Sequence, residues 1–300
     1  MTELVQHIVN GLSLGAIYAL IALGYTMVYG ILQFINFAHS EIFMLGAYIG
    51  YYTGNAMNLD NKPSIMGFFA TLFISMLGTA IIGFLVEFLA YRPLRKAARI
   101  NVLITSVGVS FLFQFGAQML FGANPRPFPA LIDLHQSFTI GNVQIDTIQI
   151  IVITVTILLM LLLDFILFGT KMGKAMRAVS HDHNVAKLLG INVNFIIGLT
   201  FMIGSALAGA AGILVGMSYP KIEPLMGLML GLKAFVAAVL GGIGNMRGAV
   251  AGGLLMGLAE QLVVSYTIPT FRDALAFAIL ILILIFKPTG LFGKTVTEKV

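Results

Sequence analysis

The sequence contains no cysteine and few charged residues, and both absences narrow the class of protein. Without cysteine, the 300-residue chain has no disulfide bond and no thiol chemistry. Asp, Glu, Lys and Arg together make up 10% of the residues, whereas 59% are hydrophobic. A water-soluble domain of this length cannot bury so much apolar surface. The composition therefore predicts a membrane protein.

Sequence patterns of enzymes are also missing. The chain has no CxxC pair, no HExxH motif and no arrangement of Ser, His and Asp suited to nucleophilic catalysis. Gly293-Lys294-Thr295 looks like the end of a phosphate-binding loop, but Pro288 occupies the position of that motif's first glycine. We interpret His181, Asp182 and His183 as a polar helix face rather than a metal site. We therefore expect no catalysis, no metal and no cofactor in this chain.

Long apolar runs recur along the whole chain. Several have about 20 residues, the length of a helix that crosses a bilayer, and they lack the alternation of membrane β-strands. The first run lacks a basic flank and a cleavage site, so we expect no signal peptide. The sequence thus predicts an all-α, polytopic helix bundle with eight or nine spans in one domain, residues 1–300. The nine predicted spans are 8–29, 31–52, 65–90, 101–122, 147–168, 193–217, 226–243, 248–266 and 273–287.

The first two predicted spans are separated by almost nothing. Tyr29 and Gly30 would have to reverse the chain at once. This pair is therefore either two spans or one broken, re-entrant element. The second interpretation gives eight spans.

The basic residues are unequally divided between the two sides of this predicted bundle. Twelve of the 17 Lys and Arg residues fall on one side, four on the other, and Lys233 lies inside a span. Cytoplasmic loops of membrane proteins carry the excess of Lys and Arg. We therefore expect the basic side and the C-terminus in the cytoplasm. The basic side comprises the connection 91–100, the central polar stretch, Arg247 and the tail from Lys287.

Two connections are long enough to have a structure of their own. The external loop 123–147 starts with three prolines that exclude a helix, and its sequence from Phe138 to Ile145 predicts a hairpin with a two-residue turn at Gly141-Asn142. It is either a simple connector or a binding surface for an external partner. The central polar stretch 169–192 predicts a short amphipathic helix that stops at Gly190. We expect a soluble partner to grip this stretch.

A few polar side chains lie inside the predicted spans, where they are costly and need a reason. One interpretation is that they brace the bundle through ion pairs and hydrogen bonds. The other is that they line a path for a polar substrate. His39 in particular is either a packing residue or a ligand. The candidate residues are Asn36, His39, Glu41, Lys233 and Glu260.

Four blocks in fixed order give the chain a strong resemblance to a known family. They are GLSLGAIYALIALGYTMVYGILQFINFAHSEIFMLGAY, MGKAMRAVSHDHNVAKLLGINV, GLKAFVAAVLGGIGNMRGAVAGGLLMGLAE and KPTGLFG. The chain resembles the permease subunits of bacterial branched-chain amino-acid ABC importers, in particular the shorter of the two paired permeases. One departure is Ser40, where the family usually has glycine.

The resemblance implies a fold of the ABC importer permease type and a multi-pass place in the bacterial inner membrane. It implies four partners besides the lipid bilayer: a second homologous permease, two ATP-binding subunits and an external substrate-binding protein. A cytoplasmic helix of such permeases docks on the ATPase, and the segment 178–190 has the matching position. The implied docking residues are Arg177, Ala178, Asp182, Ala186, Leu189 and Gly190.

The function implied is therefore that of a permease subunit for leucine, isoleucine, valine or related amino acids. The translocation path would lie in this chain and its paired permease, and ATP hydrolysis in separate subunits. The alternative is an ion-coupled secondary amino-acid transporter. A secondary transporter needs its own coupling site and no docking helix, and the central polar stretch speaks against it. A channel is less favoured, because the sequence shows no charged ring or carbonyl filter pattern.

Overall fold

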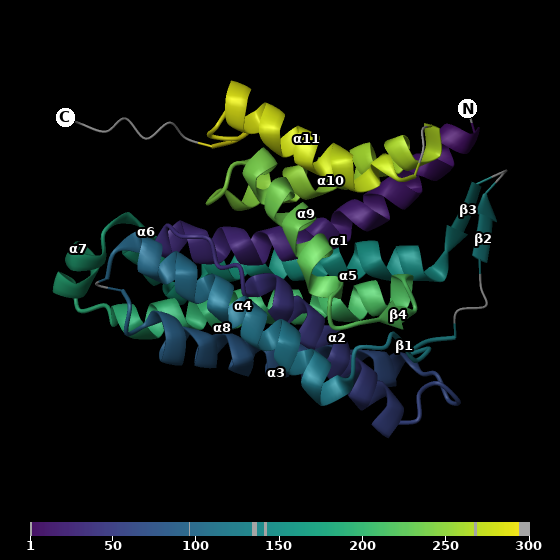
Figure 1. Cartoon of the computed structure of the whole chain (residues 1–300), viewed down its shortest axis with the longest axis horizontal. Helices are drawn as coiled ribbons and strands as arrows, with labels where there is room; N and C mark the ends of the chain where they lie inside the picture. Colours follow the sequence, from purple (N-terminus) through teal and green to yellow (C-terminus); the bar gives the residue numbers. More distant parts are fainter. Residues whose placement is uncertain (1, 96, 134–136, 141–142, 267–268, 294–300) are drawn as a thin grey trace.

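A computed structural model describes residues 2–95, 97–133, 137–140, 143–266 and 269–293. Helices make up most of the described chain, and most of them run along its long axis (Figure 1). This confirms the predicted all-α class. The helices are α1 (Thr2–Leu32), α2 (His39–Ala56), α3 (Ile65–Val86), α4 (Arg99–Phe121), α5 (Thr147–Asp164), α6 (Lys171–His181), α7 (His183–Leu188), α8 (Val193–Ser218), α9 (Met226–Gly241), α10 (Met246–Tyr266) and α11 (Phe271–Phe286). The strands are β1 (Arg126–Pro127), β2 (Ser137–Ile140), β3 (Val143–Asp146) and β4 (Lys221–Ile222).

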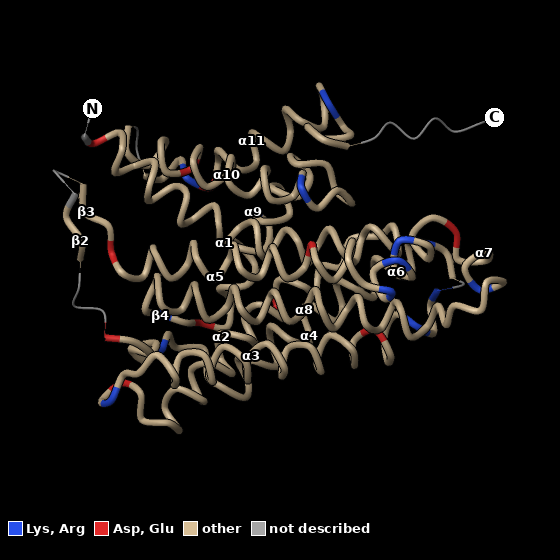
Figure 2. Tube along the Cα trace, turned by 180° about the vertical axis from the view of Figure 1, so that it is seen from behind, with Lys and Arg blue, Asp and Glu red and all other residues tan. Residues whose placement is uncertain are grey.

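The two ends of the molecule differ in charge. At one end lie the connection after α3 and the helices α6 and α7, and Lys and Arg gather there (Figure 2). We call this the basic end. The opposite end carries the β2–β3 hairpin and is called the hairpin end (Figure 1). The connection after α3 and the central polar stretch, which the sequence assigned to one basic side, therefore do meet at one end of the bundle.

Two groups of three helices share the same order but run in opposite directions. Helix α1 runs from the hairpin end to the basic end, whereas α8 runs back (Figure 1). Each first helix packs along the third helix of the other group, α1 along α10 and α8 along α3. Helices α1–α3 and α8–α10 thus form an inverted repeat, an arrangement on which many membrane transporters are built.

The second helix of each group, α2 or α9, begins inside the bundle. Gly24 of α1 touches the ring of His39, the first residue of α2. Gly24 lies two helical turns before the end of α1, so α2 starts about 12 Å inside the basic end. Helix α9 starts at the same level, because a Cβ atom at Gly227 would lie 2.6 Å from the backbone oxygen of Ser40. The two half-depth helices therefore meet at their N-termini.

This geometry corrects the expected boundary between the first two spans. Helix α1 continues through Tyr29 and Gly30 to Leu32, and the chain turns back only in residues 33–38. The reversal expected at Tyr29 and Gly30 is wrong, and the broken, re-entrant alternative comes closer. The physical reason is that α2 needs no full span of its own, since it starts from within the bundle.

The number of spans is also lower than expected. By length and composition, six described segments suit a membrane crossing, and α9 is a shorter apolar helix. The expectation of eight or nine is above this number. Helix α2 is not among the six because polar residues at both its ends lower its mean hydropathy. Helix α11 is not among them because it has only 16 residues, with two charges in its first turn. The six segments are Glu3–Leu32, Ile65–Tyr91, Arg99–Phe121, Thr147–Gly169, Val193–Ser218 and Met246–Tyr266.

The loop between α4 and α5 has the predicted hairpin. Strands β2 and β3 pair antiparallel, with Ile140 opposite Val143. The predicted turn residues 141–142 lie outside the described residues. Earlier in the loop, β1 pairs with β4, which precedes α9. The loop is therefore tied to the start of the second half-depth helix.

Glycine sets the distance between α1 and α10. A Cβ atom at Gly15 would lie 2.8 Å from the Cα atom of Leu254, and Gly257 faces the backbone of Gly15 in return. Such close approach is typical of helix pairs in membranes, where lipid offers no hydrophobic drive for association. This seam holds the two halves of the inverted repeat together.

Candidate functional site

The described chain contains three glutamate side chains with no exposed surface: Glu41, Glu87 and Glu260. An uncompensated carboxylate in such a place is costly, so its partners reveal its role. The three sites differ in how fully neighbouring groups compensate the carboxylate charge.

Glu260 of α10 lies in a complete network of charges. Its Oε1 atom is 3.0 Å from Nζ of Lys233 on α9 and also accepts a hydrogen bond from Arg272 on α11. The hydroxyl of Tyr18 on α1 donates to Oε2 at 2.7 Å. Lys233 pairs in addition with Asp273 of α11 at 2.6 Å. Four helices are therefore joined by two cations and two anions that balance one another.

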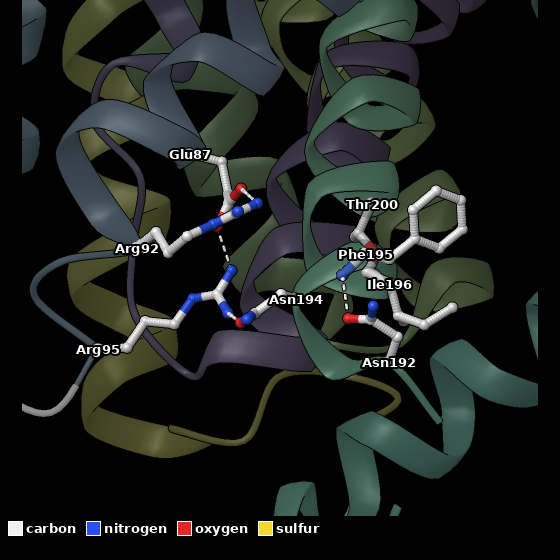
Figure 3. A network of polar contacts seen from close by, with 8 residues as sticks. All are labelled: Glu87, Arg92, Arg95, Asn192, Asn194, Phe195, Ile196 and Thr200. Atoms are coloured by element: carbon white, nitrogen blue, oxygen red, sulfur yellow. Dashed lines mark hydrogen bonds and ion pairs between the residues drawn. The ribbon is translucent and has the colours of Figure 1, made fainter. Parts of the chain in front are cut away.

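Glu87 lies near the basic end and has two cationic partners. Nη2 of Arg92 is 2.8 Å from its Oε2 atom, and Arg95 donates to Oε1. The other terminal nitrogen of Arg95 donates to Oδ1 of Asn194 at 2.6 Å, at the start of α8 (Figure 3). Burial lowers the pKa of the Arg95 guanidinium from its usual value. This network fastens the end of α3 to α8, next to the segment α6–α7.

Glu41 of α2 has no such partner. Among the described residues it forms no ion pair, and its Oε2 atom has no hydrogen-bond partner. Oε1 receives only hydroxyls at the outer limit of hydrogen bonding, Ser110 of α4 at 3.4 Å and Ser40 at 3.5 Å. A Cβ atom at Gly227 would lie 2.8 Å from Oε2, so the start of α9 closes over the carboxylate.

The central polar stretch folds as two short helices. Helix α6 ends at His181 and α7 starts at His183, with Asp182 between them. The Asp182 side chain accepts backbone hydrogen bonds from Asn184 at 2.7 Å and Val185 at 3.0 Å, and these bonds lower its pKa. The expectation of one continuous helix over 178–190 is therefore wrong, because Asp182 caps a new helix. Its predicted stop is confirmed, since Gly190 has φ +80°.

The six residues expected to dock the ATPase do not share one exposed face. Ala186 is 1% exposed and packs into its own chain. Arg177 donates to the backbone oxygen of Leu167 at 2.5 Å and lies over the ring of Phe168, which fixes α6 to the end of α5. Large apolar side chains next to Ala186 do face outward, with Leu188 at 88% exposure. Asp182, Leu189 and Gly190 are exposed, and Ala178 is half-buried.

Comparison with known proteins identifies the family of this chain. A family model described as the permease component of branched-chain amino acid transport systems matches residues 7–284. The chain belongs to this family.

Relatives within the family cover almost the whole chain. The permease protein BraD of a high-affinity branched-chain amino acid transport system in Pseudomonas aeruginosa is 42% identical over 98% of this chain and 97% of its own length. LivH of Escherichia coli K12 is 41% identical with the same coverage. LivM of the same organism is 25% identical over 94% of this chain and 69% of its own length. These relatives confirm the resemblance, and they are transport permease components.

The polar residues predicted from the spans separate into two groups in the structure. Lys233 and Glu260 pair with each other. Asn36, His39 and Glu41 lie together at the start of α2, where the Tyr91 hydroxyl donates to Oδ1 of Asn36 at 2.5 Å. The bracing interpretation thus fits the first group, whereas Glu41 remains without a brace.

Sequence reasoning missed a polar stripe on α4. The buried face of this helix consists of Val102, Ser106, Ser110, Gln114 and Ala117. The three polar residues are four apart, so they lie on one face of the helix. That regular spacing within an otherwise apolar span was the available signal. The stripe faces α2 and brings Ser110 to Glu41.

A cavity of about 860 Å³ opens at the basic end, directly below this stripe. Its inner wall includes Tyr91 and Val102, and its rim includes Arg95, Arg99 and Lys187. Val102 lies one helical turn before Ser106 and two before Ser110, so this cavity, a basic vestibule beside α7, lies close to the stripe along α4.

Proposed function

We propose that this chain is the membrane-spanning subunit of an ATP-driven importer for leucine, isoleucine, valine or related amino acids. In this proposal it forms a translocation path together with a second homologous permease. ATP is hydrolysed by two separate ATP-binding subunits, and an external binding protein delivers the substrate. Membership of the branched-chain amino acid transport family supports the substrate class.

One observation carries the coupling to ATPases. Leu188, the last residue of α7, and Leu189 after it are 88% and 73% exposed, beside a buried Ala186. Apolar side chains this exposed outside the membrane-spanning helices mark a protein contact. The segment is rigidly held on both sides, by Arg177 at the end of α5 and by the Asn192 cap of α8, whose side chain accepts from Phe195 at 3.1 Å. Movement of a docked partner would therefore be passed to α5 and α8.

The orientation follows from the same proposal. The basic end lies in the cytoplasm of a bacterial cell, in keeping with the excess of Lys and Arg there, and the C-terminus is proposed to be cytoplasmic as well. The hairpin end then faces outward, where β2 and β3 are available to the binding protein. The chain crosses the inner membrane several times.

The experiment is copurification followed by an ATPase assay. The tagged chain is purified from its native membrane, reconstituted in liposomes, and assayed with and without a leucine-loaded binding protein. We expect two ATPase subunits and a second permease to copurify, with hydrolysis stimulated by the loaded protein. A chain that purifies alone and moves amino acid down an ion gradient would contradict the proposal.

Docking is tested with Leu188→Asp and Lys171→Gln. Leu188→Asp places a charge on the exposed apolar face of α7 and should reduce the copurifying ATPase at least about tenfold. Lys171→Gln removes an exposed charge at the start of α6 and should leave copurification unchanged. Equal recovery of ATPase with both variants would place the docking surface elsewhere.

A further inference from the structure

Glu41 is the one fully buried carboxylate of the described chain that lacks a cation. Glu87 and Glu260 each have two basic partners, whereas Glu41 receives two hydroxyls at 3.4 and 3.5 Å and keeps Oε2 free. Burying a carboxylate in this way costs free energy unless a positive group compensates it. The described chain supplies no basic side chain for it, so beyond the helix N-termini beside it the compensation has to come from a proton or from a positive group outside the chain.

The surroundings of Glu41 suit a positive group that binds transiently. Glu41 lies where three helices meet: α2 that carries it, α4 with Ser110, and α9 with Gly227. A Cβ atom at Gly227 would come within 2.6 Å of the Ser40 backbone oxygen, so α2 and α9 are closed against each other. Separation of α4 from α2 would open the junction at Glu41 without breaking any ion pair.

Two helix N-termini lie beside the carboxylate. Helices α2 and α9 have 18 and 16 residues, and neither has a side-chain cap at its N-terminus. The positive end of the helix dipole favours a negative group at such a place. A free oxygen for a cation and two positive helix ends for an anion are thus found at one junction. This combination matches the two charges of a zwitterion.

Polar side chains extend from this junction in both directions along α4. Gln114 lies one turn beyond Ser110 on the buried face of α4, and Ser106 lies one turn before it. Toward the basic end, Val102 of the same helix and Tyr91 line the cavity of about 860 Å³. A polar molecule released from Glu41 would therefore meet side chains that form hydrogen bonds on its way to the basic vestibule.

We propose that Glu41 is a transit site for the α-ammonium group of a zwitterionic amino acid, at the junction of α2, α4 and α9. The inference rests on the proposed import of amino acids and adds the residue that meets the substrate in the membrane. The positive N-termini of α2 and α9 receive the α-carboxylate. Because the junction is closed in this conformation, the site forms only when it opens between α2 and α4.

The test uses the complete complex in proteoliposomes, with radiolabelled leucine uptake and ATP hydrolysis measured together. Glu41→Gln keeps the shape of the side chain and removes its charge, so leucine moved per ATP should fall about tenfold or more. Stimulation of hydrolysis by the binding protein should persist. Glu41→Asp keeps the charge and should stay within about threefold of the original chain.

Glu223→Gln is the matched control. Glu223 is half-buried at the hairpin end, where it pairs with Lys221 at 3.7 Å. Its neutralisation should leave uptake and hydrolysis unchanged. If the unsubstituted complex shows no ATP-dependent uptake, the proposed function fails; if it does and Glu41→Gln transports equally well, only the Glu41 site is overturned. A dependence of uptake on external Na⁺ would assign the free oxygen to a metal ion and would also overturn it.

A second variant applies if the Glu41→Gln chain does not assemble. Ser110→Lys places a fixed ammonium beside the carboxylate, since the Ser110 oxygen is 3.4 Å from Oε1. It should block uptake and raise the thermal stability of the complex, whereas the neutral Ser110→Met should do neither to the same extent. Normal uptake by the Ser110→Lys complex would overturn the site.

Discussion

Two interfaces of this bundle treat buried charge in opposite ways. Where α1, α9, α10 and α11 meet, the Glu260 carboxylate is matched by Lys233 and Arg272, and Tyr18 donates to its remaining oxygen. Where α2 meets α4, Glu41 has only two distant hydroxyls. The first interface is also sealed by glycine, with α1 and α10 in backbone contact.

The difference shows which part of the bundle is built to stay closed. Balanced charges and close backbone packing favour a fixed arrangement, because separation would expose unpaired ions and open a seam. The α2–α4 interface has neither feature, so its parts can separate at lower cost. We therefore regard the α1–α10 side as the static frame and the α2–α4 side as the moving part.

The largest expected effect compares the two carboxylates directly. Glu260→Gln leaves the buried Lys233 and the half-buried Arg272 with one anion fewer, so the free energy of unfolding should fall by about 3–5 kcal/mol. Glu41→Gln removes a charge that has no partner, and stability should stay the same or rise. Thermal unfolding of the purified chain in detergent measures both. Equal destabilisation by the two substitutions would abolish the distinction between frame and moving part.

A second comparison concerns glycine. Gly257→Leu inserts a side chain into the α1–α10 seam, where the backbone of Gly15 lies in contact, and should cost about 1–3 kcal/mol of stability. Gly116→Leu on α4 meets open space, with nothing within 4 Å of its Cβ position. We expect no loss from it. If Gly257→Leu and Gly116→Leu unfold at the same midpoint, the α1–α10 seam is not tightly packed in solution.

The smallest expected effect is local, at the break between α6 and α7. Asp182→Ala removes the cap of α7, so the amides of Asn184 and Val185 should exchange hydrogen faster, while the rest of the bundle is unchanged. Backbone hydrogen bonds lower the pKa of Asp182. The cap therefore stabilises α7 fully at pH values above the usual aspartate pKa, and this stabilisation is lost only as the pH falls through the lowered pKa.

The pH series gives this prediction its control. Exchange at Asn184 and Val185 in the unsubstituted chain should show no change in protection between about pH 5 and 8, once the intrinsic pH dependence of exchange is removed. Asp182→Asn keeps an oxygen that accepts the same bonds and should behave like the original chain. A cap that weakens near neutral pH would contradict the assignment.

Much of the architecture was open to prediction from the sequence. Apolar length and period gave the all-α class, and the hairpin at residues 137–146 followed from its turn residues and alternation. Ion pairing of the charges inside the spans was one of two interpretations, because unpaired charges are costly in a membrane, and the pair of Lys233 and Glu260 fits it. The four sequence blocks carried the family, which the match over residues 7–284 confirms.

Other features could not be predicted from the local sequence pattern. Nothing between Tyr29 and His39 shows that the chain turns back inside the bundle, because that depends on α8 and α9 filling the space beside it. Ala186 was expected at a partner surface, yet it packs into its own chain at 1% exposure. An alanine carries no local signal for which side of a short helix will be covered.

The sequence by itself determined that this chain is a bundle of membrane helices with one basic end, because composition, apolar length and charge distribution depend on no distant contact. Only the tertiary structure decided which buried charges are compensated. Glu41 and Glu260 look alike in their spans, but four helices bring cations and a hydroxyl to one and only hydroxyls to the other. Pairing in a low-dielectric interior is fixed by which side chains meet across helices, and the inverted arrangement of α1–α3 and α8–α10 sets those meetings.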